Sequence, residues 1–578
     1  MLRRRAVVTA YRPRPPIHVK ALAITIAAAT LLSVLMWIRH SDCLVLVVWS
    51  SREKYELLDE LVNRYDARRV DRRCVKVDVE LVASGAAEER LAEWQDERRG
   101  RPHIWSPASN AWLLLLQENR RRNKLPDIVP AVAQSLIQSP TVIGMPEPME
   151  AVLRADRPRI GWDDISELAQ DPMGWSRFGK PWGPVRLVKT TPENSTSGLH
   201  ALISLNNVAQ SAADRRRFLQ GSESGVAHYP DSVNAYLQTL YRLDAQGKSM
   251  THMSAMAVEE KQIFDYNRGN PTGRPCVQLC GPEPTVKLKA VYPKGGTLIA
   301  NHPYAILNWP DQADGALYRQ AASEFQDYLE GDAVQRYFQS QGFRNHRGEA
   351  GAILAAPYFE GSEPVATYTV QVPRAIRDTL DEWRDGLRKR ANAFLVLDVN
   401  GLDQQIAPGT TKLDLVKRAM NTALANLASN DAIGLRIVPS ASVDVSREVQ
   451  PRAPLGPAPT QLSREIDQLR TENGRPTLYA AMKAAADSVR AAYARDRVNA
   501  LVVITEGVPN DGAGAHFDLM LSLREQPIDR RVLIFVVALS TSARADLQAI
   551  ADESGGLYYD ASEVAGIAGA IRNALLNL

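Results

Sequence analysis

Hydroxyl side chains are grouped where the chain is expected to turn from a strand into a helix. A helix start exposes free N–H groups and the positive end of the helix dipole, and short hydroxyl side chains add donors without bulk. Several such starts converging on one crevice would suit an anion or a compact polar solute, while each alone is also an ordinary helix cap. The segments are Ser50-Ser51, Ser84-Gly85, Trp105 to Ser109 and Asn194 to Gly198.

Motifs that would indicate an enzyme are missing from the chain. It contains no GxSxG nucleophile elbow, no HExxH pair and no phosphate-cradling GxxxxGK loop. His302 lies in Asn301-His302-Pro303, which is typical of a loop turn rather than of a catalytic base. We therefore expect a binding protein and not an enzyme.

The elements that position these segments alternate between apolar, strand-like runs and amphipathic helices. Such alternation at short spacing is typical of parallel βαβ units, so the fold class is α/β. In the first half the strands are 44–49 and 76–82 and the helices are 53–65 and around 88–94. In the last third the same pattern covers 394–397, 413–427, 432–438, 478–492, 501–504 and 532–538.

The N-terminus carries a candidate membrane anchor. Residues 21–38 contain no charge, and at about 1.5 Å per residue they nearly match a hydrocarbon core of about 30 Å. Six basic residues precede the run and few follow it, which places the N-terminus in the cytoplasm. A cleaved signal peptide is the alternative, but the run is longer than usual and ends in Met36-Trp37-Ile38-Arg39.

The cysteines and the charge agree with a protein outside the cell membrane. Four cysteines, Cys43, Cys74, Cys276 and Cys280, permit two disulfides there. Cys43 and Cys74 each precede a strand-like run, and adjacent parallel strands would bring them close enough to bridge. The net charge of +3 is near neutral for 578 residues, so we expect no nucleic-acid partner. The arginine clusters 68–73 and 120–122 are interpreted as solvated helix faces.

The hydroxyl segments, with Trp182-Gly183 between the third and fourth, resemble bacterial extracellular solute-binding proteins of the type 2 periplasmic-binding fold. Segments 165–175, 290–293 and 335–344 are similar to later elements of that family. The resemblance implies two α/β lobes with a ligand between them, and nearby relatives include molybdate and sulfate binders. By position it assigns the ligand-binding residues Ser50, Ser51, Ser84, Ser106, Asn194, Ser195, Thr196 and Ser197, with Tyr266 and Asn267 from the facing lobe.

Residues 391–578 resemble a von Willebrand factor A domain. Asp398 to Leu402, Gly409 to Asp414, Pro476 to Tyr479 and Val502 to Gly507 carry this resemblance. It implies a doubly wound, Rossmann-like sheet with a divalent ion, Mg²⁺ as the candidate, at a degenerate site of Asp398, Asn400, Thr477 and Glu506. Leu402 stands where a hydroxyl residue is usual, and Glu506 where Asp is usual. The alternative is that Asp398 and Glu506 are solvated loop carboxylates.

Together these features predict a single-pass protein of the plasma membrane with its bulk outside. We expect it to hold a small polar solute or oxyanion between two lobes and a protein partner through its last domain. The alternatives are an adhesion or assembly scaffold with a vestigial cleft, and a receptor that serves a transporter. The expected parts are a basic cytoplasmic N-terminus (1–20), a transmembrane helix (21–38), a solute-binding domain (43–360), a linker (361–390) and the last domain (391–578).

Overall fold

The computed structural model describes most of the chain after the candidate anchor. The described residues are 43–65, 73–94, 100–276, 280–310, 315–360, 365–368, 372–438, 446–457, 460–472, 476–507 and 509–578. The expected span 21–38 lies outside them. Within the described ranges, no helix combines the length and the apolar character needed to cross a bilayer.

The first lobe is a five-stranded sheet with strand order β2-β1-β3-β10-β4. The first three strands run parallel, while β10 is antiparallel to β3 and to β4. The strands are β1 (Leu44–Ser50), β2 (Val75–Leu81), β3 (Ile104–Ser106), β4 (Gln134–Ser135) and β10 (Pro303–Ile306). The helices are α2 (Arg52–Arg64), α3 (Ser84–Glu93), α4 (Asn110–Arg122), α11 (Gly315–Glu330) and α12 (Asp332–Ser340).

The second lobe is built around a sheet with strand order β6-β7-β5-β8, and β9 also pairs with β5. Its strands are β5 (Ser139–Pro146), β6 (Leu187–Val188), β7 (Ala255–Glu259), β8 (Leu288–Val291) and β9 (Ile299–Ala300). Its helices are α5 (Glu147–Asp156), α6 (Trp162–Gln170), η1 (Gly174–Phe178), α7 (Thr196–Val208), α8 (Ala212–Gly225), α9 (Val233–Ala245), η2 (Ser249–Thr251) and α10 (Glu260–Asn267). The chain therefore crosses between the lobes after β4 and returns between β9 and β10.

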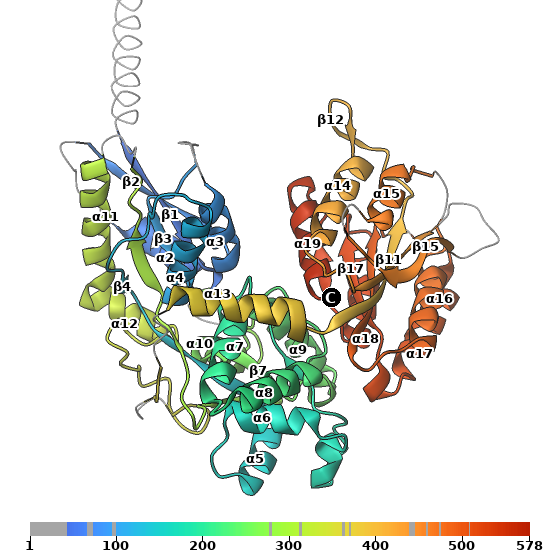
Figure 1. Cartoon of the computed structure of the whole chain (residues 1–578), viewed down its shortest axis with the longest axis horizontal. Coiled ribbons are helices and arrows are strands. Elements are labelled where there is room, and N and C mark those ends of the chain that lie inside the picture. The colour runs from blue at the N-terminus through green and yellow to red at the C-terminus, as the bar shows by residue number, and fades with distance from the viewer. Residues whose placement is uncertain are drawn as a thin grey trace, which may run out of the picture.

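A connecting helix follows the lobes. It consists of α13 (Pro373–Glu382) and one turn of π-helix, η3 (Trp383–Leu387). In Figure 1 the gold helix α13 runs from the lobes toward the orange and red C-terminal domain. Its buried side chains Ile376 and Leu380 belong to a large core that includes residues of the lobes and of one face of the C-terminal sheet.

The C-terminal domain has one six-stranded sheet, β15-β14-β11-β16-β17-β18, in which only β15 is antiparallel to its neighbour. The side chains of β11 alternate between its two faces: Leu395 and Leu397 share a core with α14 and α19, while Phe394 and Val396 share one with α16 and α17. This confirms the expected doubly wound arrangement.

The elements of that domain begin with β11 (Arg390–Asp398), β12 (Gln405–Ala407), β13 (Thr410–Thr411), α14 (Lys412–Leu424), β14 (Ala432–Val438), β15 (Arg447–Pro454) and α15 (Gln461–Gln468). They continue with α16 (Leu478–Ala491), β16 (Arg497–Thr505), α17 (Gly512–Arg524), η4 (Ile528–Arg530), β17 (Leu533–Ala538), α18 (Arg544–Ser554), β18 (Tyr558–Asp560), η5 (Val564–Gly566) and α19 (Ile567–Leu576).

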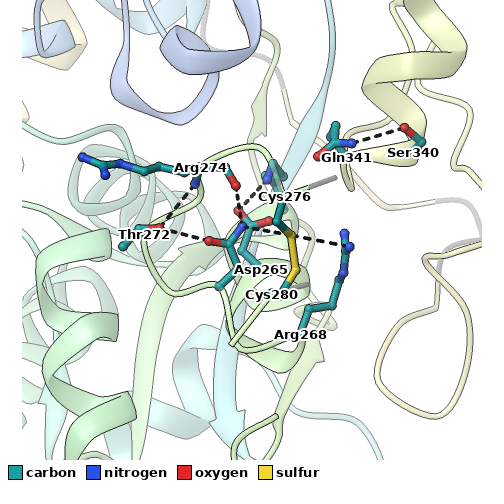
Figure 2. Close-up of a disulfide and its surroundings, with 10 residues drawn as sticks. Asp265, Arg268, Thr272, Arg274, Cys276, Cys280, Ser340 and Gln341 are labelled. Carbon is teal, nitrogen blue, oxygen red and sulfur yellow. Dashed lines mark hydrogen bonds and ion pairs between the residues drawn. A yellow bond between two sulfur atoms is a disulfide. The ribbon is translucent and has the colours of Figure 1, made fainter. Parts of the chain in front are cut away.

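Two disulfides are present. Cys43 and Cys74 are bonded at the starts of the parallel strands β1 and β2, where the spacing of the strand-like runs had placed them. The disulfide between Cys276 and Cys280 closes a short loop, which Figure 2 shows. Arg268 lies beside this disulfide, and Arg268 Nη2 donates to the Cys276 sulfur at 3.7 Å. Both bonds agree with an oxidising compartment.

One arginine cluster differs from its interpretation as a solvated face. Arg121 and Arg122 reach solvent and pair with Glu118, but Arg120 is only 3% exposed. Its guanidinium donates to the backbone carbonyls of Leu91, Trp94 and Pro126. Helical periodicity turns Arg120 toward α3, where these free carbonyls supply the acceptors that a buried guanidinium needs.

Candidate functional site

The predicted serines of the first lobe do meet at one edge of its sheet. Ser50 ends β1 and Ser106 ends β3 at the same register position, because these strands are parallel. Ser51 directly precedes α2, and Ser84 begins α3 after β2. All four serines are at most 5% exposed. The strand–turn–helix pattern in the sequence thus placed them correctly relative to one another.

The centre of this serine cluster is filled by a lysine of the chain itself. The Nζ atom of Lys54 donates to Ser51 Oγ at 2.8 Å, to the carbonyl of Ser106 at 2.7 Å and to that of Pro107 at 3.3 Å. Burial lowers the pKa of Lys54 to about 7, against the opposing charges of Glu53 and Glu259. Sequence reasoning missed Lys54, although it lies one helical turn after Ser51 and therefore on the same face.

A buried histidine links this lysine to the second lobe. His302 Nδ1 lies 3.3 Å from Lys54 Nζ, and His302 Nε2 lies 3.3 Å from the Oε2 atom of Glu259, which ends β7. Burial lowers the pKa of His302 and raises that of Glu259, so both groups favour their neutral forms. His302 has a positive φ of 37° at the crossover between the lobes. It lies in the short loop between β9 and β10, as expected, and there forms part of the lobe contact.

The lobes also touch through the other predicted loops. The Gly85 amide donates to the carbonyl of Asn194 at 3.3 Å, and Trp112 Nε1 donates to Thr196 Oγ1 at 2.9 Å. A Cβ atom on Gly85 would lie 2.2 Å from the carbonyl oxygen of Glu193, so only glycine permits this approach. Ser195 directly precedes α7, and Ser197 is buried in its first turn. The lobes are therefore closed on each other here.

Tyr266 and Asn267 are not brought to the serines. Asn267 exchanges hydrogen bonds with the backbone of Leu288, donating at 2.9 Å and accepting at 2.8 Å, and so fixes the start of β8. Tyr266 is fully buried and packs edge-to-face on Tyr241. Their place near the end of α10 turns both side chains into the second lobe. The carboxylate at the other end of that helix, Glu259, faces the first lobe instead.

A cavity of about 440 Å³ lies where both lobes, the connecting helix and the C-terminal domain meet. Gly85 and the predicted residue Asn194 line it from the two lobes, and Trp383 from η3. Ligand pockets in proteins commonly measure about 300–1,000 Å³, so a compact solute fits. Four arginines also line the cavity: Arg377, Arg384, Arg388 and Arg572.

The cavity favours a ligand that accepts hydrogen bonds. Trp383 Nε1, Thr191 Oγ1 and Arg377 Nε are buried and have no hydrogen-bond partner among the described residues. Of the lining carboxylates, Glu88 has its pKa raised to about 7 by burial, against the hydrogen bond from Asn119 and the charge of Arg377. Each of the four guanidiniums already pairs with a carboxylate of the protein: Arg377 with Asp381, Arg384 with Glu193, Arg388 with Asp431 and Arg572 with Glu89. The preference for a strongly polar solute therefore rests on the unpartnered donors of Trp383, Thr191 and Arg377.

In the C-terminal domain the candidate metal residues lie at the carboxyl ends of the strands. Asp398 ends β11, and its Oδ1 accepts from the backbone and side-chain nitrogens of Asn400 at 3.1 and 2.9 Å. Its Oδ2 accepts from Thr505 Oγ1 at 2.8 Å. Thr477 directly precedes α16, and Glu506 follows β16.

These residues, as arranged, do not fit a divalent cation. Asn400 presents its amide nitrogen rather than its oxygen to Asp398, and Leu402 is fully buried and apolar. Glu506 Oε1 already accepts from the ammonium of Lys412 at 2.7 Å. Across the described parts of the chain, no group of three or more His, Cys, Asp or Glu side chains is placed to hold a metal ion. The Mg²⁺ expectation therefore stays a prediction without geometric support.

Comparison with family models identifies two regions. Residues 46–344 match the bacterial extracellular solute-binding protein model, and residues 402–572 match the von Willebrand factor type A domain model. No curated protein matches the sequence.

Solved structures of both kinds are similar to parts of the chain. The periplasmic binding protein AfuA from Actinobacillus pleuropneumoniae, with fructose-6-phosphate bound, is 12% identical (59% of this chain, 98% of that chain, TM-score 0.39). The sulfate-binding protein SubI from Mycobacterium tuberculosis is 13% identical (52% and 86%, TM-score 0.34). A von Willebrand factor type A protein from Catenulispora acidiphila is 14% identical (33% and 42%, TM-score 0.27).

Proposed function

Because the chain belongs to the bacterial extracellular solute-binding protein family over residues 46–344, we propose that it binds a small anionic or strongly polar solute without converting it. We propose further that its von Willebrand factor A domain binds a protein partner, and that an N-terminal anchor holds the protein at the outer face of the plasma membrane. The charge-free run 21–38 and the two disulfides support this location.

The observation that carries the solute proposal is the cavity at the junction of the lobes. Both lobes contribute to it through Gly85 and Asn194, as expected for a ligand held between them. Its unpartnered donors, Trp383 Nε1, Thr191 Oγ1 and Arg377 Nε, would pair with the oxygens of an oxyanion or a phosphorylated or carboxylated solute. The cluster around Lys54 is a poorer candidate, because Lys54 already uses the acceptors at its centre.

A thermal-shift screen of the full chain against sulfate, phosphate, molybdate, sugar phosphates and dicarboxylates tests this proposal. A bound solute at 100 times its Kd stabilises the protein by about 2.7 kcal/mol, which raises Tm measurably. Arg377→Gln removes one guanidinium from the cavity and should abolish the shift. Arg447→Gln, at an exposed arginine far along the chain, should preserve it. No stabilisation by any of these solutes would contradict the proposal.

A second function, an assembly scaffold with a closed cleft, is favoured by one observation. Lys54 Nζ donates to Ser51 Oγ and Trp112 Nε1 donates to Thr196 Oγ1, so these two predicted cleft hydroxyls are already hydrogen-bonded within the protein. Capture of a surface protein by the full chain, unchanged when the same solutes are added and absent when the von Willebrand factor A domain is deleted, would support the scaffold.

A further inference from the structure

Two acidic groups, Asp398 and Glu506, lie at the strand edge, which is the side of the C-terminal sheet where β11 and β16 have their carboxyl ends. Asp398 ends β11, Glu506 follows β16, and these strands pair in parallel up to Leu397 and Ile504. Asp398 is 1% exposed. A carboxylate at the rim of a core requires hydrogen-bond donors or a positive charge to compensate its burial.

Lys412 supplies that charge. Its Nζ atom donates to Glu506 Oε1 at 2.7 Å and to the carbonyl of Leu539, just after β17, at 3.4 Å. The Lys412 side chain is only 7% exposed. The ammonium thus lies between the carboxyl ends of β16 and β17, where oxygen atoms from two strands face it.

The sequence fixes the lysine in this position. Lys412 is the first residue of α14, directly after the cap Thr411. Thr411 Oγ1 accepts from the Asp414 amide at 3.2 Å, while the Asp414 carboxylate accepts from the Thr411 amide at 2.8 Å. The Lys412 amide itself donates to the carbonyl of Gln404 at 2.9 Å. A capping box and a loop contact therefore aim the side chain at the strand edge.

The hydrogen-bond donors around Asp398 belong to residues of the same domain. Asn400 and Thr505 satisfy both carboxylate oxygens, and the fully buried side chain of Leu402 offers no ligand atom. We propose that the Lys412 ammonium takes the place of a divalent ion at this strand edge, and that the domain folds and binds its partners without a metal ion. This inference does not depend on the proposed solute binding.

Titration of the full chain with Mn²⁺ and Mg²⁺, followed by Mn²⁺ electron paramagnetic resonance and by Tm, tests the inference. At matched ionic strength, the wild-type protein should bind no stoichiometric Mn²⁺. Its Tm should be the same in excess Mg²⁺ as in about 5 mM EDTA, which is enough to remove a divalent ion from a site of ordinary affinity. Stoichiometric Mn²⁺ binding by wild type, lost in Glu506→Gln, would overturn it.

Lys412→Met is the matched variant. It keeps an unbranched side chain, one atom shorter, but removes the charge, so Glu506 loses its partner and Tm should fall by roughly 5–10 °C. Lys483→Met removes an exposed lysine from a pair with Asp487 and should change Tm by less than about 1 °C. The double variant Lys412→Met with Glu506→Leu should recover most of the loss, since no uncompensated carboxylate remains there. An unchanged Tm in Lys412→Met would contradict the assigned role.

Discussion

Arg242 of the second lobe makes a two-pronged ion pair with Asp552 of the C-terminal domain. Arg242 Nε donates to Asp552 Oδ2 at 2.8 Å, and Arg242 Nη2 donates to Asp552 Oδ1 at 2.9 Å. Next to it, Lys248 Nζ donates to Glu553 at 2.7 Å. These pairs join α9 and its following turn to the end of α18, so the two family domains are docked rather than merely tethered.

We expect this pair to stabilise the docked arrangement by about 1–2 kcal/mol. Bidentate geometry and the low exposure of Asp552, 5% for its side chain, place the pair above ordinary surface ion pairs. A double-mutant cycle of Arg242→Met and Asp552→Asn, followed by calorimetric unfolding of the full chain, measures the coupling. The same cycle at Arg495 and Asp529, both largely exposed, should give a coupling close to zero.

Acid should weaken the docking through two buried histidines. His228 Nδ1 lies 3.0 Å from Asn577 Oδ1, and His252 Nε2 lies 2.7 Å from Arg531 Nη1. Burial lowers the pKa of His228 to about 4 and that of His252 to about 3, with Arg531 adding to the second shift. When released into water, each imidazole would titrate near pH 6.5.

The sign follows from proton uptake. Between pH 6.5 and the lowered pKa values, the histidines bind protons when the domains are separated but not when they are docked. The histidines therefore do not weaken docking above pH 6.5. Below pH 6.5 the favourable free energy of docking decreases by about 1.4 kcal/mol per pH unit for each histidine. The radius of gyration from small-angle X-ray scattering should therefore increase between pH 6.5 and pH 4.5. A variant with both His228→Gln and His252→Gln should lose most of this dependence; an equal expansion in that variant would exclude the histidines as its cause.

Gly85→Ala should force the lobes apart. Its methyl group would lie 2.2 Å from the Glu193 carbonyl oxygen and 2.5 Å from Asn194 Cα, and both are backbone atoms that cannot rotate away. We expect a loss of about 1–3 kcal/mol in the free energy of unfolding, read as a lower Tm. Gly514→Ala, within α17 and with open space around it, should instead raise stability by about 0.5–1 kcal/mol. Equal behaviour of the two variants would show that the lobe contact is not tight.

Local sequence patterns predicted the strand ends but not the charges that fill them. Ser50, Ser84 and Ser106 were found because a strand followed by a helix leaves its turn residues at one sheet edge, whatever the rest of the chain does. Lys54 was missed because a lysine in an amphipathic helix normally reaches water. Its burial depends on His302, which is 248 residues away in the sequence. No local pattern encodes that contact.

The cavity at the junction was also beyond sequence reasoning, for a related physical reason. The segment 361–390 was expected only as a linker, yet its residues Arg377, Trp383, Arg384 and Arg388 line one side of the cavity. Asn194 was assigned to the cleft by resemblance and does line this space, whereas Tyr266 and Asn267 turn into the second lobe. The direction of a side chain from a helix end depends on how that helix packs, and packing is set by contacts distant in sequence.

Lys54 should give the full chain an unusual dependence of stability on alkaline pH. With its pKa lowered to about 7, the folded protein releases the Lys54 proton, while the unfolded chain keeps it up to about pH 10.4. The unfolded state therefore binds more protons in this window. The free energy of unfolding should rise by about 1.4 kcal/mol per pH unit from this group as pH increases from 7 toward 10.

Glu259 acts in the opposite sense, because its raised pKa makes the folded state retain a proton that the unfolded chain loses above about pH 4.3. The contribution of Lys54 is therefore measured as the difference in Tm between wild type and Lys54→Met. The same difference is measured in the Glu259→Gln background, where the opposing carboxylate is absent. In both backgrounds the lysine should add a positive slope to Tm between pH 7 and pH 10. Parallel curves with and without Lys54 in both backgrounds would mean that the ammonium stays charged in its buried site, held by the carbonyls of Ser106 and Pro107.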